Sequence, residues 1–372
     1  MRKQVTQFIP WSLRPGQSWA RPSRRSLPSG MTGCSLYGVS ESSLEKADYL
    51  NFHHQKAQVE QGALTQAESQ ALLKRITMTT SKDCFAQADF VLEAIPEKMD
   101  VKHTFWEEVS RLVGEDVVLA TNTSGMSVTE IAQAVYRPER FAGMHWVNPP
   151  HLIPLVEVIA GEASADETLD ILCDIAVSLE KKPVRVYKDP TGFILNRLQY
   201  AVVREAFHCV EMGYASMEDV DNVVKYGLGL RYACIGPFET IDFGGIDIFN
   251  KVGSYMFDAL CNDGGLPRLL KEAYEEGKCG VKNCKGFYDY SDGKDQTALA
   301  RRDAAFIAVC NALYGKPNPE APEGAGVSRR PLFLPEPSGR GHIDWRGRLS
   351  AEHFGREIPA GKEGEHARVD QR

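Results

Sequence analysis

Residues 89–123, DFVLEAIPEKMDVKHTFWEEVSRLVGEDVVLATNT, decide the fold of this chain. Asp89–Ala94 and Val117–Thr123 are short runs rich in apolar and β-branched residues, which is typical of buried strands. Between them, Met99–Leu112 repeats its apolar residues at helical spacing. A strand, a helix and a second strand in this order predict a βαβ unit of a parallel sheet.

The same alternation continues on the carboxyl side of this unit. Ser127 stands before VTE with Glu130 three residues further on, which is the arrangement of a helix N-cap. The sequence then predicts strands at FAGMHWV and LVEVIAG, a helix over Asp166–Glu180 and a last strand at PVRVYK. We therefore expect a doubly wound α/β domain with a parallel sheet over residues 1–188, in which residues 1–40 are atypical.

After Asp189 the sequence changes to helical spacing. Residues 193–213, FILNRLQYAVVREAFHCVEMG, form the first of several such segments, and each of them ends at turn residues such as Gly, Asp or Asn. We expect an all-α C-terminal domain over residues 189–315. Residues 316–372 are rich in Pro, Gly, Arg and Glu, a composition that predicts a disordered tail.

The composition predicts a soluble globular protein with a small-molecule partner. Of the 372 residues, 43% are hydrophobic and 25% are charged, and the formal net charge is -7. A negative net charge argues against nucleic-acid binding, and no apolar run reaches transmembrane length, so we expect no membrane association. The nine cysteines are scattered and form no CxxC pair, which favours free thiols in a reducing, cytoplasmic compartment and no metal site.

Four polar residues between positions 120 and 160 make this segment the candidate catalytic region. Ser124, His145, Asn148 and Glu157 lie in or directly after predicted strands. A histidine titrates near neutral pH, a carboxylate can fix its tautomer, and hydroxyl and amide groups can hold a substrate oxygen. The segment therefore predicts a site that removes a proton from a substrate.

Six segments together resemble the 3-hydroxyacyl-CoA dehydrogenase family. In chain order they are NTSGMS, FAGMHWVNPP, LVEVI, TGFILNRL, GPFETIDFGG and KGFYDY, and the resemblance covers Val39 to Tyr314. NPPHLIPLVEV, NRLQYAVVREA and GLGLRYACIGPFET are most similar to the lambda-crystallin and L-gulonate 3-dehydrogenase branch, whereas KGFYDY resembles the shorter-chain acyl-CoA members. The resemblance implies a Rossmann-type first domain, NAD as the cofactor and a homodimer formed through the helical domain.

The resemblance also implies a role for each candidate residue. His145 is the base that takes the proton of the substrate's 3-hydroxyl, and Glu157 orients it. Ser124 and Asn196 hold the reacting oxygen. A structural histidine, a turn or cap serine and a structural helix asparagine are the alternatives for His145, Ser124 and Asn196.

Further residues match positions that approach the cofactor in the family. They are Gly16, Glu97, Lys102, Ser124 and Asn148. Glu97 and Lys102 follow the strand DFVLEA, and the carboxyl ends of strands are where doubly wound sheets bind ligands. A solvated acid and a surface lysine are the alternatives for these two. In the same way, Lys56 and Lys74 would either meet the phosphates of CoA or lie on a solvated helix face.

The amino-terminal segment departs from the family. A hydrophobic strand, a GxGxxG loop and a second strand that ends in an acidic residue are expected there. This chain retains only Gly16, with Trp11 and Leu13 in place of the first two glycines and Gly38 in place of the acid. Bulky side chains block the close approach of the backbone to a pyrophosphate, so the sequence predicts weakened NAD binding.

Two hypotheses address this segment. The codons of residues 29–32, read from the third base of the first, can spell Gly-His-Asp, so we suggest that residues from about 20 to 38 are an out-of-frame translation or a gene-model error. An intact GxGxxG in another reading frame of the gene would support this hypothesis, and its absence from all frames would exclude it. Alternatively, residues 1–40 contain no Asp or Glu, which is typical of a mitochondrial transit peptide, although four prolines interrupt the required helix.

Three functions remain open at this point. The first is an NAD-dependent oxidoreductase that oxidises a 3-hydroxyacyl-CoA or a related 3-hydroxy acid to the 3-keto product. The second is a sugar-acid dehydrogenase like the lambda-crystallin branch. The third is a catalytically silent structural or binding protein without a working dinucleotide loop.

Overall fold

The computed structural model describes residues 34–60 and 65–314. The expected features at Trp11, Leu13, Gly16 and residues 316–372 lie outside the described residues.

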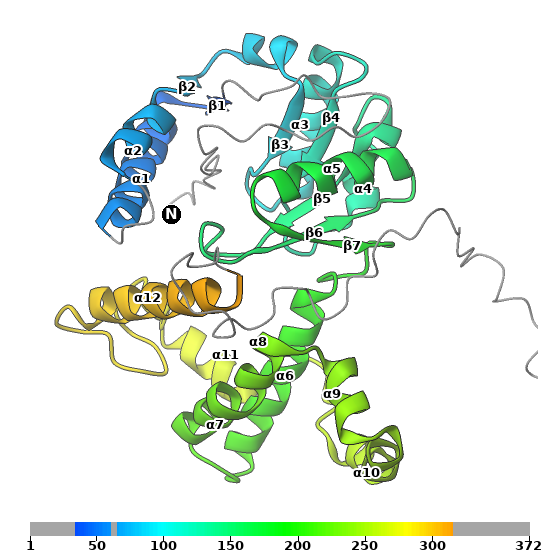
Figure 1. Cartoon of the computed structure of the whole chain (residues 1–372), viewed down its shortest axis with the longest axis vertical. Helices are drawn as coiled ribbons and strands as arrows, with labels where there is room; N and C mark the ends of the chain where they lie inside the picture. Colours follow the sequence, from blue (N-terminus) through cyan, green and yellow to red (C-terminus); the bar gives the residue numbers. More distant parts are fainter. Residues whose placement is uncertain (1–33, 61–64, 315–372) are drawn as a thin grey trace, which may run out of the picture. The chain divides into compact units, whose positions relative to one another are not determined.

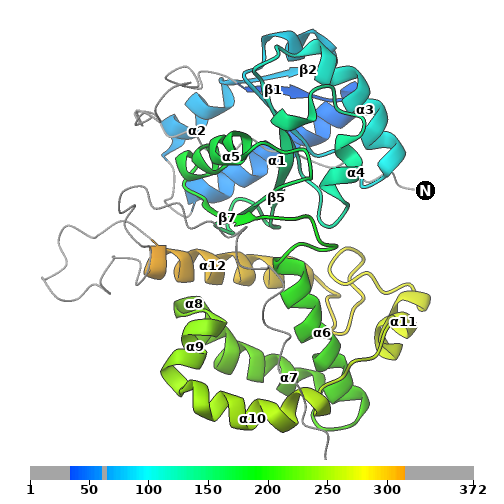
Figure 2. The same cartoon turned by 90° about the vertical axis from the view of Figure 1, so that its right-hand side faces the viewer.

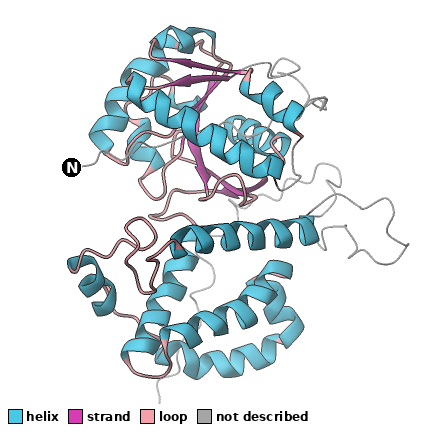
Figure 3. Cartoon of the chain, turned by 90° about the vertical axis from the view of Figure 1, so that its left-hand side faces the viewer, coloured by secondary structure: helices cyan, strands magenta, loops and turns pink. Residues whose placement is uncertain are grey.

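The named strands all belong to the part of the chain before residue 188, and the named elements after it are helical (Figure 3). Two sheets are present among the described residues. The first pairs β1 (Cys34–Tyr37) with β2 (Ile76–Thr79) in parallel. The second contains, in sheet order, β3 (Phe90–Glu93), β4 (Val118–Thr121), β5 (Phe141–Trp146), β6 (Leu155–Ile159) and β7 (Lys182–Val186).

Helices cover both faces of the five-stranded sheet, as the doubly wound prediction requires (Figure 1). Successive residues of a strand point to opposite faces. In β4, Leu119 packs in one core cluster with Trp106 of α3 (Met99–Leu112) and Ile131 of α4 (Val128–Ala132), whereas Ala120 packs in a second cluster with Leu172 of α5 (Asp166–Ser178). The helices and 3-10 turns of this part are α1 (Glu41–Glu60), α2 (Gln66–Leu73), η1 (Lys82–Gln87), α3 (Met99–Leu112), α4 (Val128–Ala132), η2 (Pro138–Arg140) and α5 (Asp166–Ser178).

The sheet is not entirely parallel, which corrects one part of the sequence prediction. β5 and β6 pair in antiparallel fashion, while the other three pairings are parallel. The connection between β5 and β6 spans only residues 147–154 and contains no helix. A parallel crossover needs a dozen residues or more, so this short connection can only return the chain as a hairpin.

The part of the chain after residue 188 is helical. α6 ends at Glu211, close to the predicted stop at Gly213, whose φ of +72° suits glycine. Residues 237–260, another of the segments with helical spacing, form two helices, because the chain turns at Gly245 with a φ of +92° (Figure 2). The elements are α6 (Leu195–Glu211), α7 (Met217–Val223), η3 (Val224–Gly229), α8 (Leu230–Cys234), α9 (Pro237–Gly244), α10 (Ile246–Ala259), α11 (Arg268–Glu275) and α12 (Lys294–Tyr314).

Three further observations concern the described residues. All nine cysteines carry free thiols. Within residues 34–60 and 65–314, every helix is too short or too polar to span a membrane. No group of three His, Cys, Asp or Glu side chains in the same ranges gathers as a metal site would require.

Candidate active site

The register of the β5–β6 hairpin places His145 directly opposite Glu157. Both side chains point to the same face of the sheet because cross-strand partners share a face. The distance between His145 Nδ1 and Glu157 Oε2 is 2.8 Å, and both side chains are almost completely buried. The carboxylate accepts a hydrogen bond from the Nδ1 proton, which leaves Nε2 as the basic nitrogen of the ring.

The second oxygen of Glu157 binds the beginning of α6. Oε1 accepts the backbone N–H groups of Ile194 at 3.0 Å and Leu195 at 2.9 Å. A carboxylate is favourable there because the first N–H groups of a helix have no partner within it. The preceding Gly192 and Phe193 both have positive φ, at +75° and +50°, and this turn directs the two amides toward Glu157.

These contacts determine the charge state of Glu157. Burial raises the pKa of this carboxyl group, but the hydrogen bonds from His145 and from the amides of Leu195 and Ile194 outweigh it, so the pKa lies below its ordinary value. Glu157 is therefore negatively charged near neutral pH. A buried anion beside the imidazole stabilises the imidazolium that forms when Nε2 takes a proton.

Ser124 lies on the loop after β4, and the structure brings Asn196 to the same loop. The side-chain amide of Asn196 donates a hydrogen bond to the backbone oxygen of Ser124 at 2.7 Å. The two segments approach closely at Gly125, where an added Cβ would lie 3.3 Å from the nitrogen of Gly192. The glycine at position 125 thus allows the loop to lie against the turn that precedes α6.

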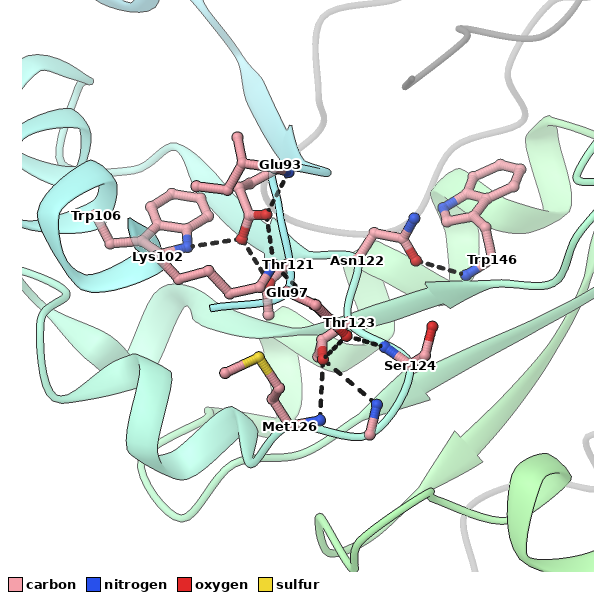
Figure 4. A network of polar contacts seen from close by, with 12 residues as sticks. Glu93, Glu97, Lys102, Trp106, Thr121, Asn122, Thr123, Ser124, Met126 and Trp146 are labelled. Carbon is pink, nitrogen blue, oxygen red and sulfur yellow. Dashed lines mark hydrogen bonds and ion pairs between the residues drawn. The ribbon is translucent and has the colours of Figure 1, made fainter. Parts of the chain in front are cut away.

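Glu97 fixes the Ser124 loop through its carboxylate. Its Oε1 accepts the hydroxyl of Thr123 at 2.6 Å and the backbone N–H of Ser124 at 2.7 Å. The Thr123 hydroxyl oxygen also accepts the N–H of Met126 at 3.0 Å. Figure 4 shows these contacts converging on the tight turn after β4. Glu97, which the sequence assigns to the cofactor, thus already holds the loop that carries Ser124.

Lys102 has a different environment from the one expected. Its side chain is completely buried, and its ammonium group lies 2.6 Å from Glu93 Oε1 and 3.4 Å from Glu97 Oε2 (Figure 4). Glu93 and Thr123 were not predicted from the sequence as members of the site. An acid at the end of the apolar strand FVLE was the available signal, because a buried charge requires a partner.

The turn after β5 carries Asn148, which is exposed. This turn is held by Lys181, whose ammonium group donates to the backbone oxygens of Pro150 at 2.5 Å and Ile153 at 2.9 Å. Burial lowers the pKa of Lys181 to about 8. Lys56 and Lys74 both have exposed side chains in the α1–α2 region.

Comparisons with known proteins show the family of this chain. Residues 29–190 match the NAD binding domain of 3-hydroxyacyl-CoA dehydrogenase, and residues 192–290 match its C-terminal domain. The chain belongs to the 3-hydroxyacyl-CoA dehydrogenase family. Members of this family are NAD-dependent dehydrogenases, and the resemblance inferred from the sequence motifs is confirmed.

Several relatives illustrate the range of the family. The chain is 37% identical over 234 residues to 5-formyl-3-hydroxy-2-methylpyridine 4-carboxylate 5-dehydrogenase of Mesorhizobium japonicum, and the match covers 63% of this chain and 76% of that protein. It is also 37% identical over 254 residues to a probable 3-hydroxybutyryl-CoA dehydrogenase of Deinococcus radiodurans, with 68% and 86% coverage.

Solved structures give the same assignment. A crystal structure of a 5-formyl-3-hydroxy-2-methylpyridine 4-carboxylic acid 5-dehydrogenase, described as an NAD+-dependent dismutase, has a TM-score of 0.70 at 33% identity, and the match covers 76% of this chain and 91% of that one. The structure of (S)-3-hydroxybutyryl-CoA dehydrogenase from Ralstonia eutropha has a TM-score of 0.57 at 31% identity, with 70% and 91% coverage.

The described residues fit NAD at the ends of β3, β4 and β5, but not at the end of β1, where an acid would bind the adenosine ribose. Polar groups lie after β3, β4 and β5, where a doubly wound sheet binds its ligand. After β1, however, Gly38 offers no carboxylate for the adenosine ribose. A Cβ at this position would lie 2.5 Å from Ser43 Oγ and 2.7 Å from Leu44 Cδ2, so the turn as folded has no room for an acidic side chain.

Proposed function

We propose that this protein oxidises the 3-hydroxyl group of a 3-hydroxyacyl-CoA, or of a related 3-hydroxy acid, to the 3-keto product. In this family NAD accepts the hydride. The observation that carries the proposal is the buried His145–Glu157 pair, whose Nδ1 to Oε2 distance is 2.8 Å. This geometry provides a base with a fixed tautomer beside an anion that stabilises its protonated form.

In this proposal the residues of the chain remove the proton of the substrate's 3-hydroxyl and hold the reacting oxygen. His145 Nε2 removes the proton of the 3-hydroxyl as the carbon that bears this hydroxyl gives its hydride to NAD. Glu157 keeps the Nδ1 proton in place and remains negatively charged. Ser124 and Asn196 hold the reacting oxygen. The support is their proximity, since the Asn196 side-chain amide donates to the backbone oxygen of Ser124 at 2.7 Å.

We also propose that Glu97, Ser124 and Asn148 lie beside the nicotinamide end of NAD. Their support is their position after β3, β4 and β5. The contributions of Gly16 and of the rest of the amino-terminal segment stay predictions. Because Gly38 lacks the acid that binds the adenosine ribose, we expect NAD to bind more weakly than in a protein with that acid.

A second substrate class is supported by the comparisons. The relative with a TM-score of 0.70 acts, by its description, on a pyridine carboxylic acid. A free carboxylic acid, including a sugar acid as in L-gulonate 3-dehydrogenase, is therefore the alternative to 3-hydroxyacyl-CoA. Parallel assays with NADH and acetoacetyl-CoA, dehydro-L-gulonate or a 5-formylpyridine-4-carboxylate would separate the two classes. Turnover of free acids alone would refute the acyl-CoA assignment.

The test of catalysis is a titration with NADH followed by a rate measurement. A ligand that binds the native state raises its melting temperature, so no shift would favour a catalytically silent protein. If NADH binds, His145→Gln should lower kcat by roughly 10²–10⁴-fold, the range for a lost general base. Near-normal turnover in this variant would refute the role of His145.

We further propose that the protein is a homodimer formed through its helical part. Helices α6 to α10 contain no buried residue, and Phe238, Phe243 and Phe257 are 82%, 77% and 79% exposed. Apolar surface of this kind is unfavourable in water and marks an interaction site. A second copy is the occupant we favour, since the resemblance of this part to the family implies a dimer. We propose a cytoplasmic location, because the four prolines among residues 1–40 interrupt the amphipathic helix that a mitochondrial transit peptide requires.

A further inference from the structure

Glu93 is a fully buried carboxylate with all of its acceptor positions in use. Oε1 accepts the backbone N–H of Ile95 at 2.8 Å and the ammonium of Lys102 at 2.6 Å. Oε2 accepts the indole N–H of Trp106 at 3.2 Å and the hydroxyl of Thr121 at 2.6 Å. Four donors from three different segments hold this side chain in a single orientation, so Glu93 is a fixed point inside the domain.

Lys102 connects the buried Glu93 carboxylate to Glu97, which is partly exposed. Its side chain has no exposed area, and its ammonium group lies between Glu93 and the partly exposed Glu97, at 2.6 Å and 3.4 Å. A lysine side chain is flexible, and its ammonium group is strongly hydrated when it is exposed to water. Here the hydrogen bond to Glu93 fixes the ammonium group of Lys102. The positive charge of this group also attracts the Glu97 carboxylate toward the interior of the domain.

Glu97 completes the connection to the site. Its side chain is 41% exposed, so without an internal cation its carboxylate would be drawn into water. Instead, Oε2 faces Lys102 while Oε1 accepts the Thr123 hydroxyl and the Ser124 N–H. Figure 4 shows the chain of contacts from Trp106 and Glu93 through Lys102 and Glu97 to Ser124.

We propose that Lys102 is a positioning residue, which acts through Glu97 to hold the Ser124 loop in the conformation that the reaction requires. The role in catalysis rests on the function proposed above. The role in holding the loop does not, because it concerns only the contacts of this chain.

The test uses variants that remove the charge without leaving an unpaired buried ion. Lys102→Met alone would leave Glu93 charged and without its cation, which is strongly destabilising. The double variant Glu93→Gln/Lys102→Met removes both charges and keeps the side-chain volumes. The matched control is Lys82→Met/Glu108→Gln, which removes a lysine–glutamate pair that involves the same helix α3 but is exposed.

Hydrogen exchange of single amides, followed by NMR, gives the first measurement. In the Glu93→Gln/Lys102→Met variant the Ser124 amide should exchange about tenfold faster or more, the factor expected for loss of one charge-assisted hydrogen bond. The backbone amide of Ile131 in α4 donates to the backbone oxygen of Ser127, and its exchange rate should stay unchanged. A parallel increase at Ile131 would indicate general destabilisation and would refute a specific role of Lys102, as would an unchanged rate at Ser124.

Glu97→Gln provides the second measurement. It should accelerate exchange at Ser124 by itself, and combining it with the double variant should add little, because both changes act on the same connection. Additive effects would show that Lys102 does not act through Glu97. The Lys82→Met/Glu108→Gln control should leave the Ser124 rate unchanged.

Kinetics separates this inference from the proposed function. In an active protein the double variant should lower kcat by about 10–100-fold, since a misplaced loop affects the reacting geometry. KM for NADH should rise as well, because Glu97 and Ser124 lie beside the nicotinamide in the function proposed above. A higher KM with normal kcat would refute the positioning role and favour a cofactor contact. An inactive parent protein would refute the proposed reaction, and the exchange measurements would then decide on Lys102 alone.

Discussion

The sharpest prediction concerns Glu157→Gln, which changes one carboxylate oxygen to an NH₂ group. Oε1 of Glu157 accepts two backbone amides, from Ile194 and Leu195, and Oε2 accepts the Nδ1 proton of His145. Glutamine has a single acceptor oxygen. We expect that oxygen to face the two amides, because the opposite orientation would leave two N–H donors against an NH₂ group, at about 1–3 kcal/mol for each unsatisfied donor.

The consequence for His145 is a change of tautomer. The NH₂ group of the introduced glutamine would occupy the place of Oε2, so Nδ1 must accept a hydrogen bond and the ring proton must move to Nε2. A ring protonated at Nε2 cannot take the substrate's proton. The analogous Asp→Asn change in a serine protease triad lowers kcat by about 10⁴-fold for this reason. We expect a loss of roughly 10²–10⁴-fold in kcat here.

The same substitution should also reduce stability. Three hydrogen bonds to a charged acceptor are lost or become neutral, and each such change is worth about 1 kcal/mol, so the free energy of unfolding should fall by about 2–3 kcal/mol. Denaturant unfolding would measure this difference. Glu162→Gln is the matched control, because Glu162 is an exposed glutamate on the loop after β6.

Long-range ¹H–¹⁵N correlation spectra of histidine-labelled protein report the tautomer directly and require no turnover. The parent protein should show the Nδ1-protonated ring of His145, and Glu157→Gln should show the Nε2-protonated ring. Rates of acetoacetyl-CoA reduction by NADH give the second readout. An unchanged tautomer together with a normal rate in Glu157→Gln would refute the reasoning.

Three other predictions can be measured on the same protein. Burial lowers the pKa of Lys181 from 10.5 to about 8, so the unfolded state binds more protons than the folded state between these pH values. The free energy of unfolding should therefore rise from pH 8 to 10.5 by on the order of 3 kcal/mol. Lys181→Met should abolish this rise in denaturant unfolding. Phe257→Glu should convert a dimer to a monomer in sedimentation analysis, whereas Tyr274→Glu, equally exposed on α11, should not. Ser127→Ala removes the N-cap of α4 and a hydrogen bond to Asp189, and should cost about 1–2 kcal/mol of stability, with Ser178→Ala as the non-capping comparison.

Local features of the fold were predictable because their causes are local. The helix Met99–Leu112 has the bounds that its apolar spacing indicates, and Ser127 caps α4 by accepting the N–H of Glu130. The direction of β6 was predicted wrongly. A strand's own alternation of residues carries no direction, and only the length of the β5–β6 connection showed that the chain must return as a hairpin.

The polar network illustrates what the sequence cannot provide. Glu93 binds residues 2, 9, 13 and 28 positions away, and no periodicity links those spacings. By contrast, His145 and Glu157 are paired by the register of two neighbouring strands. A pairing set by strand register is accessible once the hairpin is recognised, whereas a buried ionic network depends on how a helix packs on the sheet.

The proton-transfer residues and the adenosine end of the domain depend on different parts of the chain. The β5–β6 hairpin positions His145 and Glu157, and the first amides of α6 hold Glu157 from the other side. None of these contacts involves β1, β2 or Gly38. We therefore expect a change confined to the amino-terminal segment to weaken dinucleotide binding without disturbing the geometry of the base. It follows that replacing the amino-terminal segment by an intact GxGxxG unit should strengthen NADH binding while the tautomer of His145 stays the same, and a change of that tautomer would contradict this separation.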